Sequence, residues 1–258
     1  MINKNMNLLA NKLVNAFIKN KSIPPLPSRY VKNMKNAEQF RKLCESKITK
    51  PIIGFKAAGT GIPLIKKLGE KEPFYASVYK HNLISNNSKV RINKNVLGIE
   101  LEVCYLISKN FFDLKTKISK TNINRFITHI APCIEIVGYR QNKKGIKCFG
   151  DLCSDFGANV KFVIGSKKKY KNNNVRSLKT NLSNKKINQS VNGNTNTVYI
   201  NPLNSLLFVL TKLQKDKIKH NKNFYVFTGS SVGVVPILGK GVYNGKIEKI
   251  GSVKAQIN

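Results

Sequence analysis

The sequence predicts an α+β protein that is mostly β, with a helical N-terminal arm in residues 1–50 and a β-rich domain in residues 51–258. Three observations support this prediction. Apolar residues recur at helical spacing near the N-terminus, a proline-rich segment follows them, and short β-rich runs then alternate with Gly, Asn and Ser turns. The chain has 258 residues, of which 41% are hydrophobic, enough to bury a core. Disordered and collagen-like classes are therefore excluded.

The arm begins with an expected amphipathic helix over residues 1–20, where Leu9, Leu13 and Phe17 fall at i, i+4 and i+8. This stretch is basic and contains no acidic residue, so an organellar transit peptide is the alternative. It also contains no Arg, which favours the ordinary helix. The prolines in residues 24–27 then impose an extended segment, because proline fixes φ and lacks a backbone donor.

The remaining elements follow from periodicity, turn residues and caps. Expected strands cover residues 52–55, 77–79, 98–107, 133–139, 161–164, 197–199, 225–228 and 245–257. Expected helices cover residues 36–46, residues 122–129 and a segment that begins at Asn201-Pro202, an N-cap followed by proline in the first turn. The polar stretch 166–189 is either a long hairpin or a loose surface excursion.

The net charge is unusual. Lys and Arg number 46 against 12 Asp and Glu, which gives +34 and suggests nucleic acid or an anionic membrane as a partner. Most of these cations are Lys, however, whereas Arg has the planar fork that matches phosphate and guanine edges. Lys and Asn are overused together, which favours compositional drift. We therefore expect at most non-specific binding to nucleic acid.

Cysteine and histidine usage excludes some site classes. The five Cys are scattered without a C-x-x-C pair, which predicts reduced thiols and a cytoplasmic location. With only three His, a zinc site is not expected. No run approaches 18 apolar residues, so we expect no membrane span.

Acidic residues on apolar strands are the most informative feature. A period of two places Glu100 and Glu102 on one face of the expected strand 98–107, and a third carboxylate, Glu135, lies in another apolar strand. Buried like charges are costly unless something compensates them. The set therefore suggests a site for a hard divalent cation such as Mg²⁺. The alternative is that Glu100 and Glu102 face solvent and pair with Lys.

The glycine-rich segments are less specific. Neither 59–61 nor 239–241 opens a helix after a strand, so neither is a dinucleotide or P-loop motif. The segment Thr228-Gly229-Ser230 follows a strand and offers hydroxyls and backbone N–H groups. It either cradles a substrate carboxylate or forms a plain turn.

The order of motifs resembles the 2-keto-4-pentenoate hydratase group of the fumarylacetoacetate hydrolase superfamily over nearly the full length. The matching segments are 23–26 (IPPL), 53–56 (IGFK), 100–102 (ELE), 134–137 (IEIV), 154–159 (SDFGAN), 162–165 (FVIG), 201–204 (NPLN), 227–230 (FTGS) and 250–253 (IGSV). The resemblance implies a mixed β-roll or sandwich with a helical N-terminal arm. It also implies a lyase that acts on a short 2-oxo acid and forms homo-oligomers.

The resemblance also implies roles for individual residues. Metal ligands for Mg²⁺ or Mn²⁺ would be Glu100, Glu102 and Glu135, and the catalytic lysine would be Lys56. Substrate contacts are expected from Thr228, Gly229, Ser230 and Asp155. Three segments depart from the family pattern, namely 72–76 (EPFYA), 137–140 (VGYR) and 155–156 (DF). They alter the residues that would handle protons while leaving the metal ligands intact.

Hydration of 2-hydroxypenta-2,4-dienoate to a 4-hydroxy-2-oxo acid is accordingly the leading prediction. Decarboxylation of a 2-oxo diacid, or hydrolysis of an acylpyruvate at the same metal, is the enzymatic alternative. A non-catalytic basic protein bound to RNA or an assembly is the alternative of another class. Such a protein would have no reason to keep three carboxylates in apolar strands, so the sequence favours an enzyme.

Overall fold

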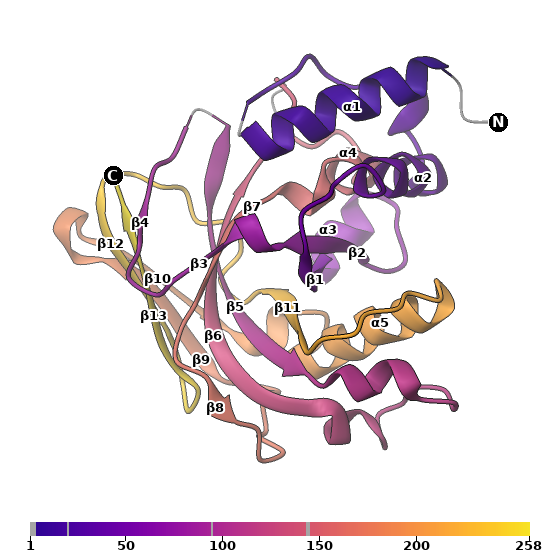
Figure 1. Cartoon of the computed structure of the whole chain (residues 1–258). Coiled ribbons are helices and arrows are strands. Elements are labelled where there is room, and N and C mark those ends of the chain that lie inside the picture. The colour runs from indigo at the N-terminus through magenta and orange to yellow at the C-terminus, as the bar shows by residue number, and fades with distance from the viewer. Residues whose placement is uncertain (1–3, 20, 94, 143–144) are drawn as a thin grey trace.

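In the computed structural model, which describes residues 4–19, 21–93, 95–142 and 145–258, two curled β-sheets lie beside a group of helices (Figure 1). The first sheet has eight strands, in the order β2 (Phe74–Tyr79), β1 (Ile52–Ala58), β11 (Phe224–Ser230), β5 (Val96–Ile107), β6 (Ile127–Gly138), β7 (Asn159–Ile164) and β3 (Leu83–Ile84), with β8 (Lys168–Lys169) paired to β6. The second has five, in the order β10 (Gln189–Asn194), β9 (Lys179–Asn184), β12 (Gly241–Ile247), β13 (Gly251–Ile257) and β4 (Lys89–Val90).

The helices are α1 (Lys4–Lys19), α2 (Met34–Glu45), α3 (Ile62–Lys67), α4 (Phe149–Ser154) and α5 (Pro202–Lys215). The cap predicted for α5 is confirmed, since the Asn201 side chain accepts from the N–H groups of Leu203 and Asn204 at 3.0 and 3.1 Å. Among the helices of the described ranges, none combines the length and apolarity that a membrane span requires.

The main core lies between the two sheets. Ile99, Leu101 and Val103 of β5 are at most 1% exposed and belong to the same cluster as Val253 of β13. The sheets approach so closely that a Cβ on Gly245 of β12 would lie 2.5 Å from Leu101 Cδ1. One face of β5 is therefore committed to the core, and its other face is left for the site.

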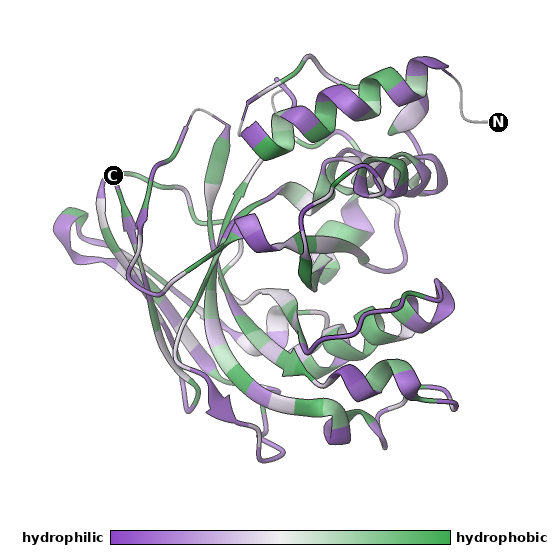
Figure 2. Cartoon of the chain, viewed as in Figure 1, coloured by the Kyte–Doolittle hydropathy of each residue, from purple (hydrophilic) through white to green (hydrophobic). Residues whose placement is uncertain are grey.

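The N-terminal arm has its own apolar cluster, which extends onto the β-rich part. The amphipathic pattern of α1 is visible in Figure 2. Its Phe17 ring lies 4.3 Å from the Phe156 ring and 6.0 Å from the Tyr79 ring, centre to centre. In α2, Glu45 accepts a hydrogen bond from the backbone N–H of Ser77 at 3.0 Å. The arm therefore packs against segments close to the site, and the boundary at residue 50 stays a prediction.

Three expected elements differ from the structure. Residues 122–129 form a short 3₁₀ turn (Ile123–Phe126) and the start of β6, because pairing with β5 extends the strand to Ile127. Residues 197–199 were expected to form a strand, but Thr197 ends a 3₁₀ turn. The backbone N–H of Tyr199 donates to the carbonyl of Thr60 and does not take part in strand pairing. Residues 245–257 are two strands, because Lys249 adopts a positive φ in the turn between β12 and β13.

Two helices that the sequence did not predict, α3 and α4, are short. With six residues each, α3 and α4 are too short to show a helical period. The polar stretch 166–189 is not one long hairpin: β9 pairs with β10, so the hairpin covers 179–194, and before it this part of the described chain contains only the short strand β8, which pairs with β6.

Candidate metal and substrate site

Three carboxylates converge on the face of the first sheet that points away from the core. In the antiparallel pair of β5 and β6, Glu100 lies directly opposite Glu135, and Glu102 lies opposite Cys133. The two-residue alternation of β5 keeps both of its glutamates on this face. Ligand atoms of the three groups lie within 4.8 Å of one another, so the predicted convergence is confirmed.

The surroundings of these carboxylates favour the protonated, uncharged form over the negatively charged form. The side chains of Glu102 and Glu135 are 0% exposed, and Glu100 is partly exposed. Burial, together with the neighbouring carboxylates, raises the pKa of Glu100 to about 7 and the pKa of Glu102 well above its ordinary value. Burial also raises the pKa of Glu135 despite the nearby Lys56 ammonium. The cluster would be stabilised by a positive charge at its centre.

Two oxygens of the cluster lack a donor in the described part of the chain. Glu102 Oε2 accepts from the Gly229 N–H at 3.0 Å, and Glu135 Oε1 accepts from Lys56 Nζ at 2.5 Å. The second oxygen of each, Glu102 Oε1 and Glu135 Oε2, is buried without a hydrogen-bond partner. Buried acceptors are rarely left unpaired, and hard divalent cations take carboxylate oxygens as ligands. The residues present therefore fit Mg²⁺ or Mn²⁺.

Lys56 lies on β1 beside this cluster and is 3% exposed. Its Nζ donates to Glu135 Oε1 and, at 3.0 Å, to the backbone carbonyl of Gly157. Burial acts to lower the pKa of Lys56, but the carboxylates of Glu135, Glu100 and Glu102 together raise it. The side chain is therefore a buried, oriented ammonium group.

A strained turn supplies the carbonyl that Lys56 contacts. Phe156, Gly157 and Ala158 all have positive φ, at 53°, 68° and 59°. Two of them are not glycine, and such conformations persist only when their surroundings impose them.

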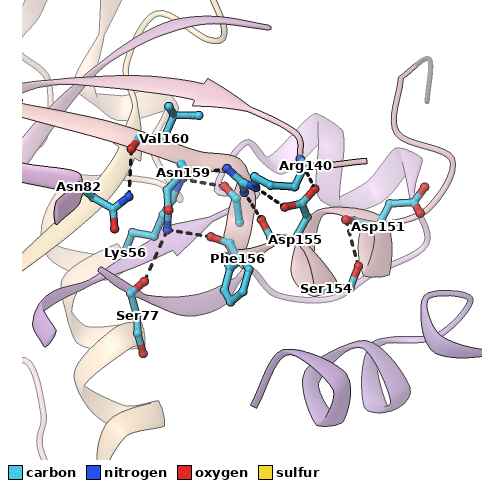
Figure 3. Close-up of polar contacts among 11 residues, drawn as sticks. Lys56, Ser77, Asn82, Arg140, Asp151, Ser154, Asp155, Phe156, Asn159 and Val160 are labelled. Atoms are coloured by element: carbon cyan, nitrogen blue, oxygen red, sulfur yellow. Dashed lines mark hydrogen bonds and ion pairs between the residues drawn. The ribbon is translucent and has the colours of Figure 1, made fainter. Parts of the chain in front are cut away.

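An arginine–aspartate pair holds this turn in place (Figure 3). From the guanidinium of Arg140, Nε donates to Asp155 Oδ1, Nη2 to the Asp155 carbonyl and Nη1 to the Asn159 carbonyl, each at 2.6 Å. The backbone N–H of Arg140 donates to Asp155 Oδ2 at 2.7 Å. Arg140 and Asp155 are 3% and 0% exposed. The pair thus brackets the turn between Asp155 and Asn159.

A cavity of about 250 Å³ opens next to Lys56 and Glu100. Of the residues expected to contact substrate, Gly229 and Ser230 line it. Thr228 is buried outside the lining, and its hydroxyl donates to the Val103 carbonyl at 2.8 Å. Two residues of this segment therefore lie at the cavity, and substrate contact by all three stays a prediction.

Asp155 also lies outside the described cavity lining. Both of its carboxylate oxygens accept from Arg140. These contacts indicate that it positions the turn beneath Lys56, and substrate contact by Asp155 stays a prediction.

The sequence reasoning did not identify Arg140 as a positioning residue, nor the apolar cavity wall formed by α3 and α4. A compositional signal was present, because Arg140 is one of only six Arg residues in a Lys-rich chain. Arg rather than Lys is the residue expected at a buried, multiply bonded ion pair. Leu64 of α3 and Leu152 of α4, which line the cavity, are ordinary apolar residues, and nothing in the sequence marks them as part of a site.

Comparison with known proteins gives matches by structure alone. No protein-family model and no curated protein matches the chain. It is similar to 4-oxalocrotonate decarboxylase from Pseudomonas putida G7, complexed with magnesium and adipate, with a TM-score of 0.85 and 16% identity over 99% of this chain and 98% of the other. It is also similar to fumarylpyruvate hydrolase from Pseudomonas aeruginosa in complex with Mn²⁺ and pyruvate, with a TM-score of 0.58 and 12% identity over 82% and 91% of the two chains.

A third similar structure is 2-hydroxyhepta-2,4-diene-1,7-dioate isomerase from Mycobacterium marinum, with a TM-score of 0.54 and 12% identity over 81% and 76% of the chains. At these identities the similarity establishes the fold. The predicted fold class is confirmed, and the hydratase group is not distinguished from its relatives.

Proposed function

We propose that this chain, which has the fold of the fumarylacetoacetate hydrolase superfamily, is a divalent-cation-dependent enzyme that acts on a short 2-oxo acid. The observation that carries the proposal is the convergence of three carboxylates, two of them fully buried, beside a buried lysine. The decarboxylase and the hydrolase of similar structure, which hold magnesium and Mn²⁺, support it.

Each residue of the site would have a distinct role. Glu100, Glu102 and Glu135 would hold Mg²⁺ or Mn²⁺, and the cation would supply Lewis-acid stabilisation of negative charge on the 2-oxo acid. Lys56 would bind the substrate carboxylate or donate a proton, because its ammonium is oriented by one hydrogen bond to Glu135 and one to the Gly157 carbonyl. The backbone of the 228–230 segment would contact the substrate from β11.

Hydration of 2-hydroxypenta-2,4-dienoate, which adds one water to give a 4-hydroxy-2-oxo acid, is the reaction that we propose first. The sequence motifs favour it. Decarboxylation of a 2-oxo diacid is the second candidate, favoured by the similarity to 4-oxalocrotonate decarboxylase over nearly the whole chain. Acylpyruvate hydrolysis would use the same carboxylates.

A purely structural or RNA-binding role accounts less well for the site. Burying Glu102 and Glu135 with unpaired oxygens destabilises the fold unless a cation binds there. A protein without a cation would gain stability from apolar residues at these positions.

A calorimetric titration with Mg²⁺ and Mn²⁺ tests the proposal. We expect the Glu102→Gln variant to bind the cation at least tenfold more weakly than the parent, with activity lost in parallel. Glu72→Gln is the matched control, because Glu72 is a half-exposed carboxylate that forms an ion pair with Lys212 on the surface. If both variants bound the cation as the parent does, the metal assignment would be wrong.

Two assays then separate the reactions. Loss of dienol absorbance with 2-hydroxypenta-2,4-dienoate reports hydration, and CO₂ release from 2-oxo diacids reports decarboxylation. Failure to turn over any 2-oxo acid in the presence of Mg²⁺ or Mn²⁺ would contradict the enzymatic proposal.

A further inference from the structure

The N-terminal helix α1 packs on the turn that contacts Lys56. Its Phe17 side chain is 5% exposed, and the centre of the ring lies 4.3 Å from that of Phe156, with an angle of 31° between the two planes. Phe156 is the first residue of the strained turn, and its side chain is 0% exposed. A residue of the arm is therefore in direct ring contact with the turn beside the site.

The turn touches Lys56 at both its ammonium and its alkyl chain. The Gly157 carbonyl accepts from Lys56 Nζ at 3.0 Å, and the other acceptor of this ammonium is Glu135. A Cβ added to Gly157 would lie 3.5 Å from Cδ and 3.6 Å from Cε of Lys56. A displacement of the turn would therefore move one acceptor of the ammonium and part of the packing around it.

The backbone of the turn needs support from its surroundings. Phe156 and Ala158 carry a Cβ but have φ values of 53° and 59°, in the left-handed region that is unfavourable for such residues. Conformations of this kind persist only when neighbouring groups impose them. Arg140 supplies the polar part of this support, and the Phe17 ring contacts the turn from its apolar side.

Phe17 also shields the ion pair that brackets the turn. The Arg140 guanidinium carbon lies 5.2 Å from the centre of the Phe17 ring and 6.0 Å from that of Phe156. The same guanidinium donates to the carbonyls of Asp155 and Asn159 (Figure 3). Aromatic rings attract a cation, and excluding water strengthens its hydrogen bonds. Phe17 thus supports the turn both directly and through Arg140.

The segment after α1 fixes the arm to the same region. The backbone N–H of Ile23 donates to the Arg140 carbonyl at 2.8 Å, and the Ile23 carbonyl accepts from the Asn142 N–H at 2.8 Å. The Leu26 N–H donates to Gln141 Oε1, also at 2.8 Å. These contacts hold the arm in a defined position relative to Arg140.

We propose that Phe17 is a positioning residue for Lys56. Its ring holds the strained turn in the conformation that presents the Gly157 carbonyl to the Lys56 ammonium. The part of this proposal that concerns turnover rests on the proposed function, because it takes Lys56 as a participant in the reaction. The arm is then part of the apparatus that orients the site, in addition to its contribution to stability.

Hydrogen–deuterium exchange tests the support of the turn without any assay of activity. The Ala158 N–H donates to the Asp155 carbonyl at 2.9 Å, so its exchange rate, measured by mass spectrometry on a peptide that contains it, reports opening of the turn. We expect Phe17→Leu to accelerate this exchange at least tenfold, because the leucine side chain lacks the ring that contacts Phe156.

Leu13→Ala is the matched control. Leu13 lies one helical turn before Phe17, is 0% exposed and belongs to the same apolar cluster. Each of the two substitutions removes three side-chain carbon atoms from the arm. We expect Leu13→Ala to leave the exchange of Ala158 within about threefold of the parent. If Leu13→Ala accelerated it as much as Phe17→Leu, the effect would be general loosening of the arm, and the proposal would be wrong.

Turnover and cation binding provide the second measurement. Misplacing a reacting group by about 1 Å can slow a reaction about 100-fold, so we expect Phe17→Leu to lower kcat at least tenfold. The affinity for Mg²⁺, measured by calorimetry, should stay within about threefold, because the three carboxylates lie on β5 and β6 and not on the turn. Leu13→Ala should change neither quantity by more than about threefold. An unchanged kcat in folded Phe17→Leu would overturn the proposal.

A double variant tests whether Phe17 acts through the ring contact. Phe156→Leu should lower kcat in the same way, and adding Phe17→Leu to it should lower kcat by less than about a further threefold, because the contact is already lost. Fully additive effects of the two substitutions would contradict the assigned role. If the parent turned over no 2-oxo acid, the proposed function would fail, whereas the exchange of Ala158 would still decide whether Phe17 supports the turn.

Discussion

Removal of the Arg140 guanidinium tests the ion pair that braces the turn under Lys56. In Arg140→Met, the buried Asp155 carboxylate would lose its Nε donor at 2.6 Å, and the carbonyls of Asp155 and Asn159 would each lose a donor at the same distance. The backbone N–H of Arg140 would remain the donor to Asp155 Oδ2. Breaking a buried pair by removing one partner costs about 3–5 kcal/mol. We therefore expect the free energy of unfolding to fall by that amount.

Urea unfolding, followed by circular dichroism, measures the change against a matched pair on the surface. Lys212 and Glu72 form an ion pair at 2.5 Å, slightly shorter than the buried pair, but their side chains are 23% and 50% exposed. Exposed pairs contribute about 0–1 kcal/mol, so Lys212→Met should change stability little. The two pairs have similar interatomic distances, so the contrast measures the combined effect of burial and of the hydrogen bonds from Arg140 to two backbone carbonyls.

A double variant separates lost attraction from an unpaired charge. Arg140→Met with Asp155→Leu removes both charges, so we expect it to be less destabilised than the sum of the two single variants by at least about 1 kcal/mol. If Arg140→Met cost no more than Lys212→Met, the pair would not stabilise the turn, and the positioning role assigned to Asp155 would be refuted.

The remaining predictions concern the site and the surface. Lys56→Met should leave cation affinity near normal or slightly higher, because a neighbouring positive charge is gone, while turnover falls about 10²–10⁴-fold in a steady-state assay. Burial raises the pKa of Glu100 to about 7, so the folded state binds the extra proton and loses stability as pH rises from its unfolded pKa of 4.5 to 7. The increase in Tm on adding Mg²⁺ should then be larger at pH 8 than at pH 5.5, and an equal increase would contradict this. Gly157→Ala places a Cβ at 3.1 Å from Ala58 at a φ of +68° and should lower turnover, whereas Gly145→Ala, at +70° and with no described non-neighbouring residue within 4 Å, should not. RNA binding should weaken steeply between about 50 and 200 mM salt, and nanomolar, sequence-selective RNA binding at about 0.15 M salt would indicate a dedicated nucleic-acid surface.

Local patterns in the sequence determined several features correctly. The period of two in β5 assigned Glu100 and Glu102 to one face and the apolar Leu101 to the other, and the structure has this arrangement. The Asn201 cap with the following proline located the start of α5. These features depend on residues a few positions apart, so a single segment contains the information that decides them.

Contacts between residues that lie far apart in the sequence were decided only by the tertiary structure. The 35-residue separation of Glu100 and Glu135 becomes a direct cross-strand pair because of the register between β5 and β6. The same two strands pack closely against the second sheet, where a Cβ on Gly245 would lie 2.5 Å from Leu101 Cδ1 and 3.5 Å from Ile134 Cγ1. The partnership of Arg140 with Asp155 likewise depends on how the turn after α4 folds back under β6. Burial and strand register are collective properties of the packed chain, so the sequence identified the chemical groups of the site while the fold set their distances and charges.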